Sequence, residues 1–88
     1  MDTMLTMLKV DLGITSTVYD LRLTQYLTSA QAEITREGAV LNLEQVDDMQ
    51  LVVMYAAWMW RRRDGMDGMP QMLRYALNNK VFAEKMRS

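Results

Sequence analysis

The chain has 88 residues, half of them hydrophobic, and a formal net charge of −1. This length fits one domain, and so much hydrophobic content supports a folded core rather than a disordered segment. Cysteine and histidine are both absent. Their absence excludes disulfide bonds, thiolate metal sites and the commonest general base of enzymes.

The N-terminal segment lacks the features of a secretory signal. Met1–Leu12 carries Asp2, Lys9 and Asp11 within a short amphipathic pattern and has no continuous apolar core. The longest apolar run, Leu51–Trp60, has half of the roughly 20 residues that a membrane span needs. We therefore expect neither a leader nor a transmembrane helix.

Two helices are predicted in the first half of the chain. The first spans Thr3–Leu12, because apolar residues recur there at helical spacing and Gly13 is a natural residue to end it. The second begins after Thr15-Ser16-Thr17, any of which can be its N-cap, and ends near Glu37, just before Gly38. Its apolar side chains recur every three or four residues: Leu23, Leu27, Ala30 and Ile34.

The second half of the chain predicts two more helices, separated by a turn at Asp64–Gly68. The third helix runs over Val46–Arg63 after a connector at Ala39–Gln45, with an acidic first turn and a basic last turn. The fourth begins at Pro70 and ends at Asn78-Asn79, and its buried stripe consists of Met69, Met72, Leu73, Ala76 and Leu77. Residues 80–88 are expected to form a tail that continues the helix, frays, or lies on a neighbour. The fold class is all-α, a small bundle of about four helices in one domain over residues 1–88, with the third helix at its centre.

The third helix is apolar around its whole circumference. Met49, Val52, Val53, Ala56 and Trp60 fall on one face, while the other face carries Leu51, Tyr55 and Trp58. A helix that is apolar on every side is normally buried on every side, and a small domain buries only about 60% of its unfolded surface. The second face is therefore predicted to contact another subunit. The alternative is that two neighbouring helices of the same chain cover it.

The charges are divided unevenly along the chain. Residues 1–60 hold three basic and eight acidic side chains, a balance of −5, whereas residues 61–88 hold seven basic and three acidic side chains, a balance of +4. Such a division suits head-to-tail contact, in which the basic part of one subunit meets the acidic part of the next. The alternative is a solvated C-terminal end without a partner.

No catalytic motif appears in the sequence. Phosphate-binding glycine motifs and the nucleophile motif of hydrolases are absent, so we expect a protein that is not an enzyme and needs no cofactor. Asp64 and Asp67 flank Gly65, but the other ligands of a calcium loop do not follow, so no metal site is predicted. Arg61-Arg62-Arg63 is the only basic cluster and could contact phosphates together with Arg74 and Lys80.

Three segments in the second half of the chain form a recognisable ordered set: Met54-Tyr55-Ala56-Ala57 with the aromatic pair and basic run behind it, Gly68-Met69-Pro70, and Met72–Asn79. Together they resemble the head–tail connector (head-completion adaptor) family of long-tailed phages and prophages. Leu8–Ile14 and the end of the second helix at Arg36-Glu37-Gly38 also resemble the opening of that family. The resemblance covers nearly the whole chain and is sharpest from Val52 to Asn79.

The resemblance implies a structural subunit that assembles as a ring, commonly of about a dozen copies, at the head–tail junction of a virion after synthesis in the host cytoplasm. Its implied partners are other copies of itself, the portal protein, a stopper or tail-joining protein, and duplex DNA that passes through the ring without sequence preference; a membrane is not among them. The family carries no catalytic residue.

The interface residues follow from the sequence pattern. Subunit contacts are assigned to the end of the third helix: Tyr55, Trp58, Met59, Trp60, Arg61, Arg62 and Arg63. Contacts with the portal or a neighbour are assigned to the tail: Lys80, Val81, Phe82 and Met86. The possible DNA-facing side chains are Arg62, Arg63 and Arg74. The alternative function is a small helical DNA-binding or regulatory module that uses Arg61–Arg63.

Overall fold

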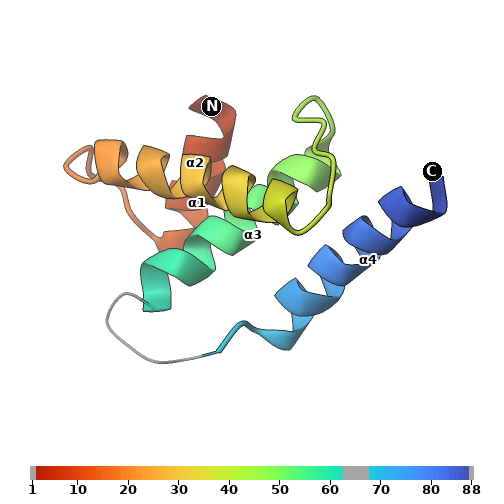
Figure 1. The fold of residues 1–88 in the computed structure, drawn as a ribbon. Helices are drawn as coiled ribbons and strands as arrows, with labels where there is room; N and C mark the ends of the chain where they lie inside the picture. Colours follow the sequence, from red (N-terminus) through yellow and green to blue (C-terminus); the bar gives the residue numbers. More distant parts are fainter. Residues whose placement is uncertain (1, 63–67, 88) are drawn as a thin grey trace.

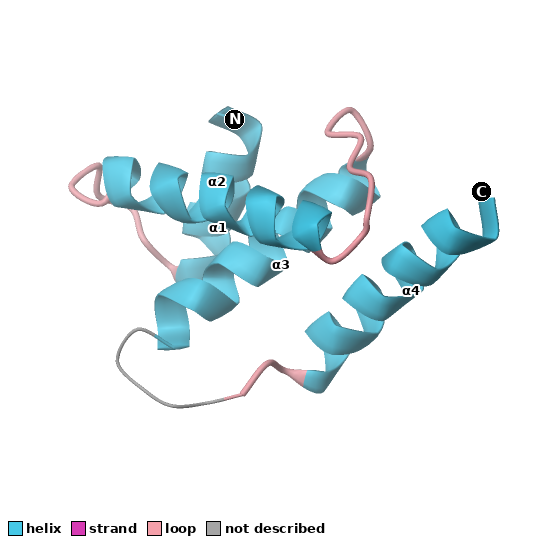
Figure 2. Cartoon of the chain, in the orientation of Figure 1, coloured by secondary structure: helices cyan, strands magenta, loops and turns pink. Residues whose placement is uncertain are grey.

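The computed structural model describes residues 2–62 and 68–87, which form four α-helices and no strand (Figures 1 and 2). These helices are α1 (Asp2–Leu12), α2 (Asp20–Arg36), α3 (Val46–Arg62) and α4 (Gln71–Arg87). α3 contacts each of the other three, with α1 and α2 packed against each other and α4 lying apart from them (Figure 1). The predicted all-α bundle with a central third helix is thus confirmed.

Glycine ends both α1 and α2. Gly13 has φ 72°, and its N–H donates to the Val10 carbonyl at 3.2 Å while the Ile14 N–H donates to the Lys9 carbonyl at 2.9 Å. Gly38 has φ 111° and ends α2 in the same way. Glycine adopts positive φ without the steric cost that a Cβ imposes, so each chain reversal satisfies carbonyls that the helix end would leave unpaired.

α2 begins later than its threonines and serine suggest. Tyr19 occupies the N-cap position without a side-chain cap, and Ser16 instead accepts a hydrogen bond from the Val18 N–H inside the preceding turn, at 3.0 Å. The prediction that one of residues 15–17 supplies the N-cap is wrong. Asp20, in the first turn, forms an ion pair with Lys9 at 2.8 Å and so links the start of α2 to α1.

The central helix is enclosed by the chain itself over most of its length. Its buried side chains point in several directions and comprise Leu51, Val52, Val53, Tyr55, Ala56 and Ala57. They join one continuous core with Met4 and Leu8 of α1, the apolar stripe of α2 and, from α4, the fully buried Leu73 and Leu77. The alternative that neighbouring helices cover the second face therefore holds for Leu51 and Tyr55.

α4 is longer than the sequence suggests. It continues through Asn78 and Asn79 to Arg87, so the predicted end at these asparagines is wrong, and of the alternatives for the tail the helical one holds over residues 80–87. The two asparagines have poor intrinsic helix propensity, but tertiary contacts outweigh propensity. Val81 packs against the core, and Lys80 forms an ion pair that holds the middle of α4 to the start of α3.

Asp48 is the only buried charged side chain among the described residues, with 6% of its surface exposed. Its carboxylate accepts hydrogen bonds from the Lys80 ammonium, at 3.0 and 3.2 Å for its two oxygens, and from the Asn42 backbone N–H at 2.7 Å. One side chain thereby joins three segments: the α2–α3 connector, the first turn of α3 and the middle of α4.

Opposite charges from the two halves of the chain meet inside the same molecule. Arg61 lies 3.7 Å from Asp11, Arg74 lies 3.6 Å from Glu37, and Lys80 pairs with Asp48. The uneven charge distribution therefore does not require a neighbouring subunit, because part of it is neutralised when α4 and the end of α3 pack against the first half.

Replacement of Asp48 by alanine tests this connection. Asp48→Ala is expected to lower the free energy of unfolding by about 2–4 kcal/mol, because it leaves a partly buried ammonium and a backbone N–H without their partner. Asp47→Ala is the matched control: Asp47 is exposed, lies next to Asp48 in the same helical turn, and should cost less than about 1 kcal/mol. Urea denaturation followed by circular dichroism measures both. Equal losses would contradict a special role for Asp48.

Candidate subunit interface

The residues assigned to a subunit interface at the end of α3 differ widely in exposure. Tyr55 is 6% exposed, Trp58, Met59 and Trp60 are half-buried, and Arg61 and Arg62 are exposed. Arg63 lies outside the described residues, as do Asp64 and Asp67. The end of α3 therefore offers a surface made of indole edges and two arginines.

Tyr55 belongs to the interior of the chain. Its ring packs edge-on against Trp58, with centroids 5.4 Å apart. Burial raises the pKa of its phenol, and the nearby carboxylates of Glu37 and Glu33 raise it further. The assignment of Tyr55 to a subunit contact is wrong, because the end of α2 at Glu37 and the part of α4 that carries Arg74 already enclose this side of α3.

Trp58 lies between α3 and the start of α4. Its ring stacks under the Arg62 guanidinium, whose central carbon is 4.7 Å from the ring centroid, a cation–π geometry. Within the described part of the chain its indole N–H has no hydrogen-bond partner. The ring borders a shallow hollow together with Met54, Ala57 and Leu73, so it remains half-buried instead of fully enclosed.

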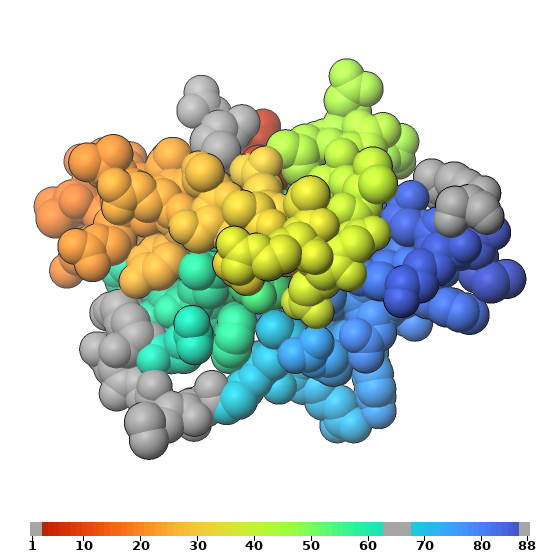
Figure 3. Space-filling view, in the orientation of Figure 1, coloured from red at the N-terminus to blue at the C-terminus, as the bar shows by residue number. Residues whose placement is uncertain are grey.

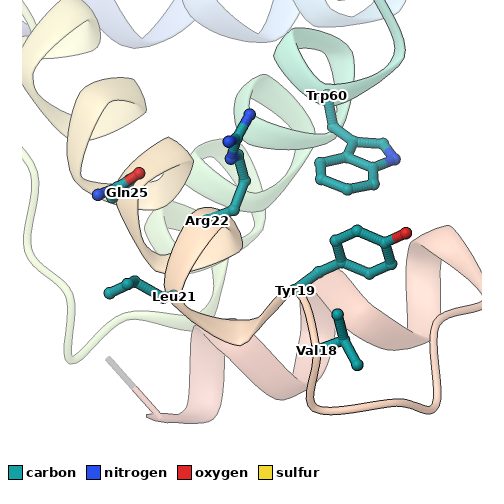
Figure 4. A pocket seen from close by; sticks show the side chains of 6 residues that line it. All are labelled: Val18, Tyr19, Leu21, Arg22, Gln25 and Trp60. Carbon is teal, nitrogen blue, oxygen red and sulfur yellow. The ribbon is translucent and has the colours of Figure 1, made fainter.

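Trp60 forms one wall of a groove at the start of α2. Its ring meets Tyr19 and Tyr26 edge-on, with centroid distances of 5.4 and 5.9 Å. We call this depression the α2 groove, and Figure 4 shows its lining: Val18, Tyr19, Leu21, Arg22, Gln25 and Trp60.

The α2 groove combines apolar side chains with an uncompensated cation. Val18 is 78% exposed and Leu21 75%, although both are aliphatic. Arg22 rises from the middle of the groove, between Gln25 and the paired rings of Tyr19 and Trp60 (Figure 4). It makes no ion pair with the residues that the structure describes. Exposed apolar groups beside an unpaired charge are typical of a binding surface.

α4 carries a second exposed apolar surface on the side away from the core. Four large side chains are at least 58% exposed: Met72, Tyr75, Phe82 and Met86. With Asn79 they alternate at spacings of three and four residues, the pattern of a helix seam that contacts another helix. We call these five residues the α4 stripe.

The α4 stripe was only partly visible in the sequence. Met72 was predicted to be buried and is 77% exposed, and Tyr75 was not assigned to any surface. Among the predicted portal or neighbour contacts, Lys80 and Val81 serve the chain's own packing, while Phe82 and Met86 are exposed. The spacing of residues 72, 75, 79, 82 and 86 is the signal that could have separated the two faces.

The predicted DNA-facing arginines that can be placed have partners within the chain. Arg62 lies over Trp58, and Arg74 is 3.6 Å from Glu37.

No group of acidic side chains suited to a metal ion occurs in the described ranges 2–62 and 68–87. None of the helices described is both long and apolar enough to cross a membrane.

Comparison of the chain with protein-family models, with curated proteins and with solved structures gives no match.

The buried phenol of Tyr55 generates a prediction about alkaline pH. Because the pKa of Tyr55 is raised above the ordinary value of 10.0 in the folded chain, folding favours the neutral phenol. This contribution to stability is complete below pH 10 and is lost as the pH rises through the folded-state pKa. The loss of unfolding free energy between pH 8 and pH 11 should therefore be smaller in Tyr55→Phe than in the unaltered chain.

Urea denaturation at the two pH values measures this difference. The control is Tyr75→Phe, whose exposed side chain lies on α4 and which should follow the unaltered chain. If Tyr55→Phe loses as much stability as the control, the phenol of Tyr55 does not resist ionisation in the folded state.

Proposed function

We propose that this protein is a structural subunit of a phage head–tail connector, which assembles head to tail into a ring through which DNA passes without sequence preference. The ring would join the portal to a tail or stopper protein. The assignment to phages rests on the resemblance of the segments from Val52 to Asn79 to that family. The proposal of a ring is supported by the surface of the molecule.

The observation that carries the ring is the presence of two separate apolar surfaces on one small subunit. The α2 groove and the α4 stripe belong to different elements, and in Figure 3 the start of α2 and the C-terminal half of α4 form opposite edges of the molecule. Two different surfaces on one subunit suit heterologous contacts, which generate rings when the rotation closes. A two-fold dimer uses one surface twice and leaves the other open.

The alternative of a small DNA-binding module has no comparable support. It needs cations that are free to contact phosphates. Of the arginines assigned to that role and described by the structure, Arg74 faces Glu37 and Arg62 covers an indole ring. An exposed apolar stripe along α4 also contributes little to binding a polyanion.

Association and DNA binding together test the proposal. Light scattering over a concentration series is expected to show masses well above one subunit, and negative-stain images of the concentrated protein should show annuli. Duplex DNA should bind weakly, and without preference among sequences of equal length. A mass that stays at one subunit at every concentration, together with tight DNA binding that falls steeply between 50 and about 200 mM salt, would instead identify the DNA-binding module.

A further inference from the structure

We propose that the α4 stripe of one copy docks in the α2 groove of the next copy. This inference rests on the proposed ring and specifies which surfaces form it. It commits to a second copy of this chain as the occupant of both surfaces. Three features support it: the match of length, the amount of apolar surface, and the polar groups at the centre of each surface.

The two surfaces span the same number of residues. The groove runs over eight residues from Val18, in the turn before α2, to Gln25 within α2. The centre of the stripe runs from Tyr75 through Asn79 to Phe82, also eight residues, all of them within α4. A helix that places side chains at i, i+4 and i+7 into an apolar groove is a recurrent mode of recognition. Met72 and Met86 would then contact the two rims.

The exposed area is large enough for a stable contact. With about 200 Å² for each large side chain, the exposed fractions of the four apolar stripe residues sum to roughly 500 Å². Val18, Tyr19 and Leu21 add roughly 400 Å² from the groove. Since interfaces are roughly 57% apolar, about 900 Å² of apolar surface corresponds to about 1,600 Å² in total, the standard size of a specific interface.

Polar groups lie at matching positions on the two surfaces. Asn79 interrupts the apolar stripe at its centre, and Arg22 and Gln25 interrupt the groove. The Asn79 carbonyl can accept a hydrogen bond from either side chain, and the Arg22 guanidinium can also lie over the Tyr75 or Phe82 ring. Uncharged residues border the centre of the stripe at Gln71, Ala76, Asn78 and Ala83, whereas the cation Lys85 lies nearer its C-terminal end, three residues after Phe82.

A symmetric α4–α4 pair is the main competing arrangement. The stripe has the spacing of a coiled-coil seam with a central asparagine, which such a pair could use. That arrangement would leave Val18, Leu21 and the unpaired Arg22 uncovered. Docking into the α2 groove covers both the groove and the stripe of every copy in a closed ring with one kind of contact.

Two single variants and their mixture distinguish these arrangements. Phe82→Glu places a charge in the α4 stripe alone, and Leu21→Glu places one in the α2 groove alone. Both side chains are exposed in the unaltered chain. Circular dichroism checks that each variant keeps its helices. Each variant alone should associate at least about tenfold more weakly than the unaltered chain. Their equimolar mixture should form dimers and nothing larger, because one intact stripe can still meet one intact groove.

The symmetric arrangement gives a different result. Leu21→Glu would then associate like the unaltered chain, and the mixture would contain no dimer of the two variants. Either finding overturns the docking of α4 into the α2 groove. If the unaltered chain forms annuli while both variants also do, the ring stands and this interface is wrong. If the unaltered chain remains a single subunit throughout, the proposed function itself fails.

Cross-linking provides a second measurement that does not depend on weakened association. The chain has no cysteine, so single cysteines can be introduced without interference. Under associating conditions, a short bis-maleimide should join Asn79→Cys to Leu21→Cys in a mixture and should not join Asn79→Cys to itself. The matched control is Ser29→Cys, an exposed position farther along α2, which should not react with Asn79→Cys. Self-linking of Asn79→Cys would establish the α4–α4 pair.

Discussion

Enclosure of α3 is the constraint on which the rest of the molecule depends. An apolar helix cannot leave both of its faces in water, and the chain has few residues with which to cover them. α1 and α2 cover one side, while α4 closes the other with Leu73 and Leu77. The ion pair between Asp48 and Lys80 fixes α4 against the start of α3 at a point where apolar contact alone would leave the helix free to slide.

The way in which α1, α2 and α4 cover α3 determines which surfaces remain exposed. α4 contacts mainly α3, so only one of its faces can be buried, and its other large side chains stay exposed. α2 is held to α1 by Lys9 and Asp20 and to α3 by the contacts of Tyr19 and Tyr26 with Trp60, which leaves the apolar side chains of its first turn uncovered. Three helices of so short a chain enclose the apolar α3 and then lack the material to cover their own outer faces.

The sequence predicted the elements better than the surfaces. Gly13 and Gly38 end their helices because positive φ is inexpensive only for glycine, a local property that a sequence displays directly. The extent of α4 and the exposure of Met72 depend on how one helix turns against another, which no local pattern specifies. Tyr55 was misassigned for the same reason: its neighbours Glu37, at the end of α2, and Arg74, on α4, are distant in sequence, and only the packing of both helices against α3 brings them to it.

Packing within the chain limits which charges could act between the subunits of the proposed ring. The pairs Arg61–Asp11, Arg74–Glu37 and Lys80–Asp48 consume charges that could otherwise have steered one subunit to the next. In the proposed ring, association through the remaining surfaces would therefore depend on apolar burial, which salt does not screen, and Arg22 would select the register. Contacts of that kind can hold subunits together beside a polyanion such as DNA, whereas contacts made of exposed ion pairs would compete with its phosphates.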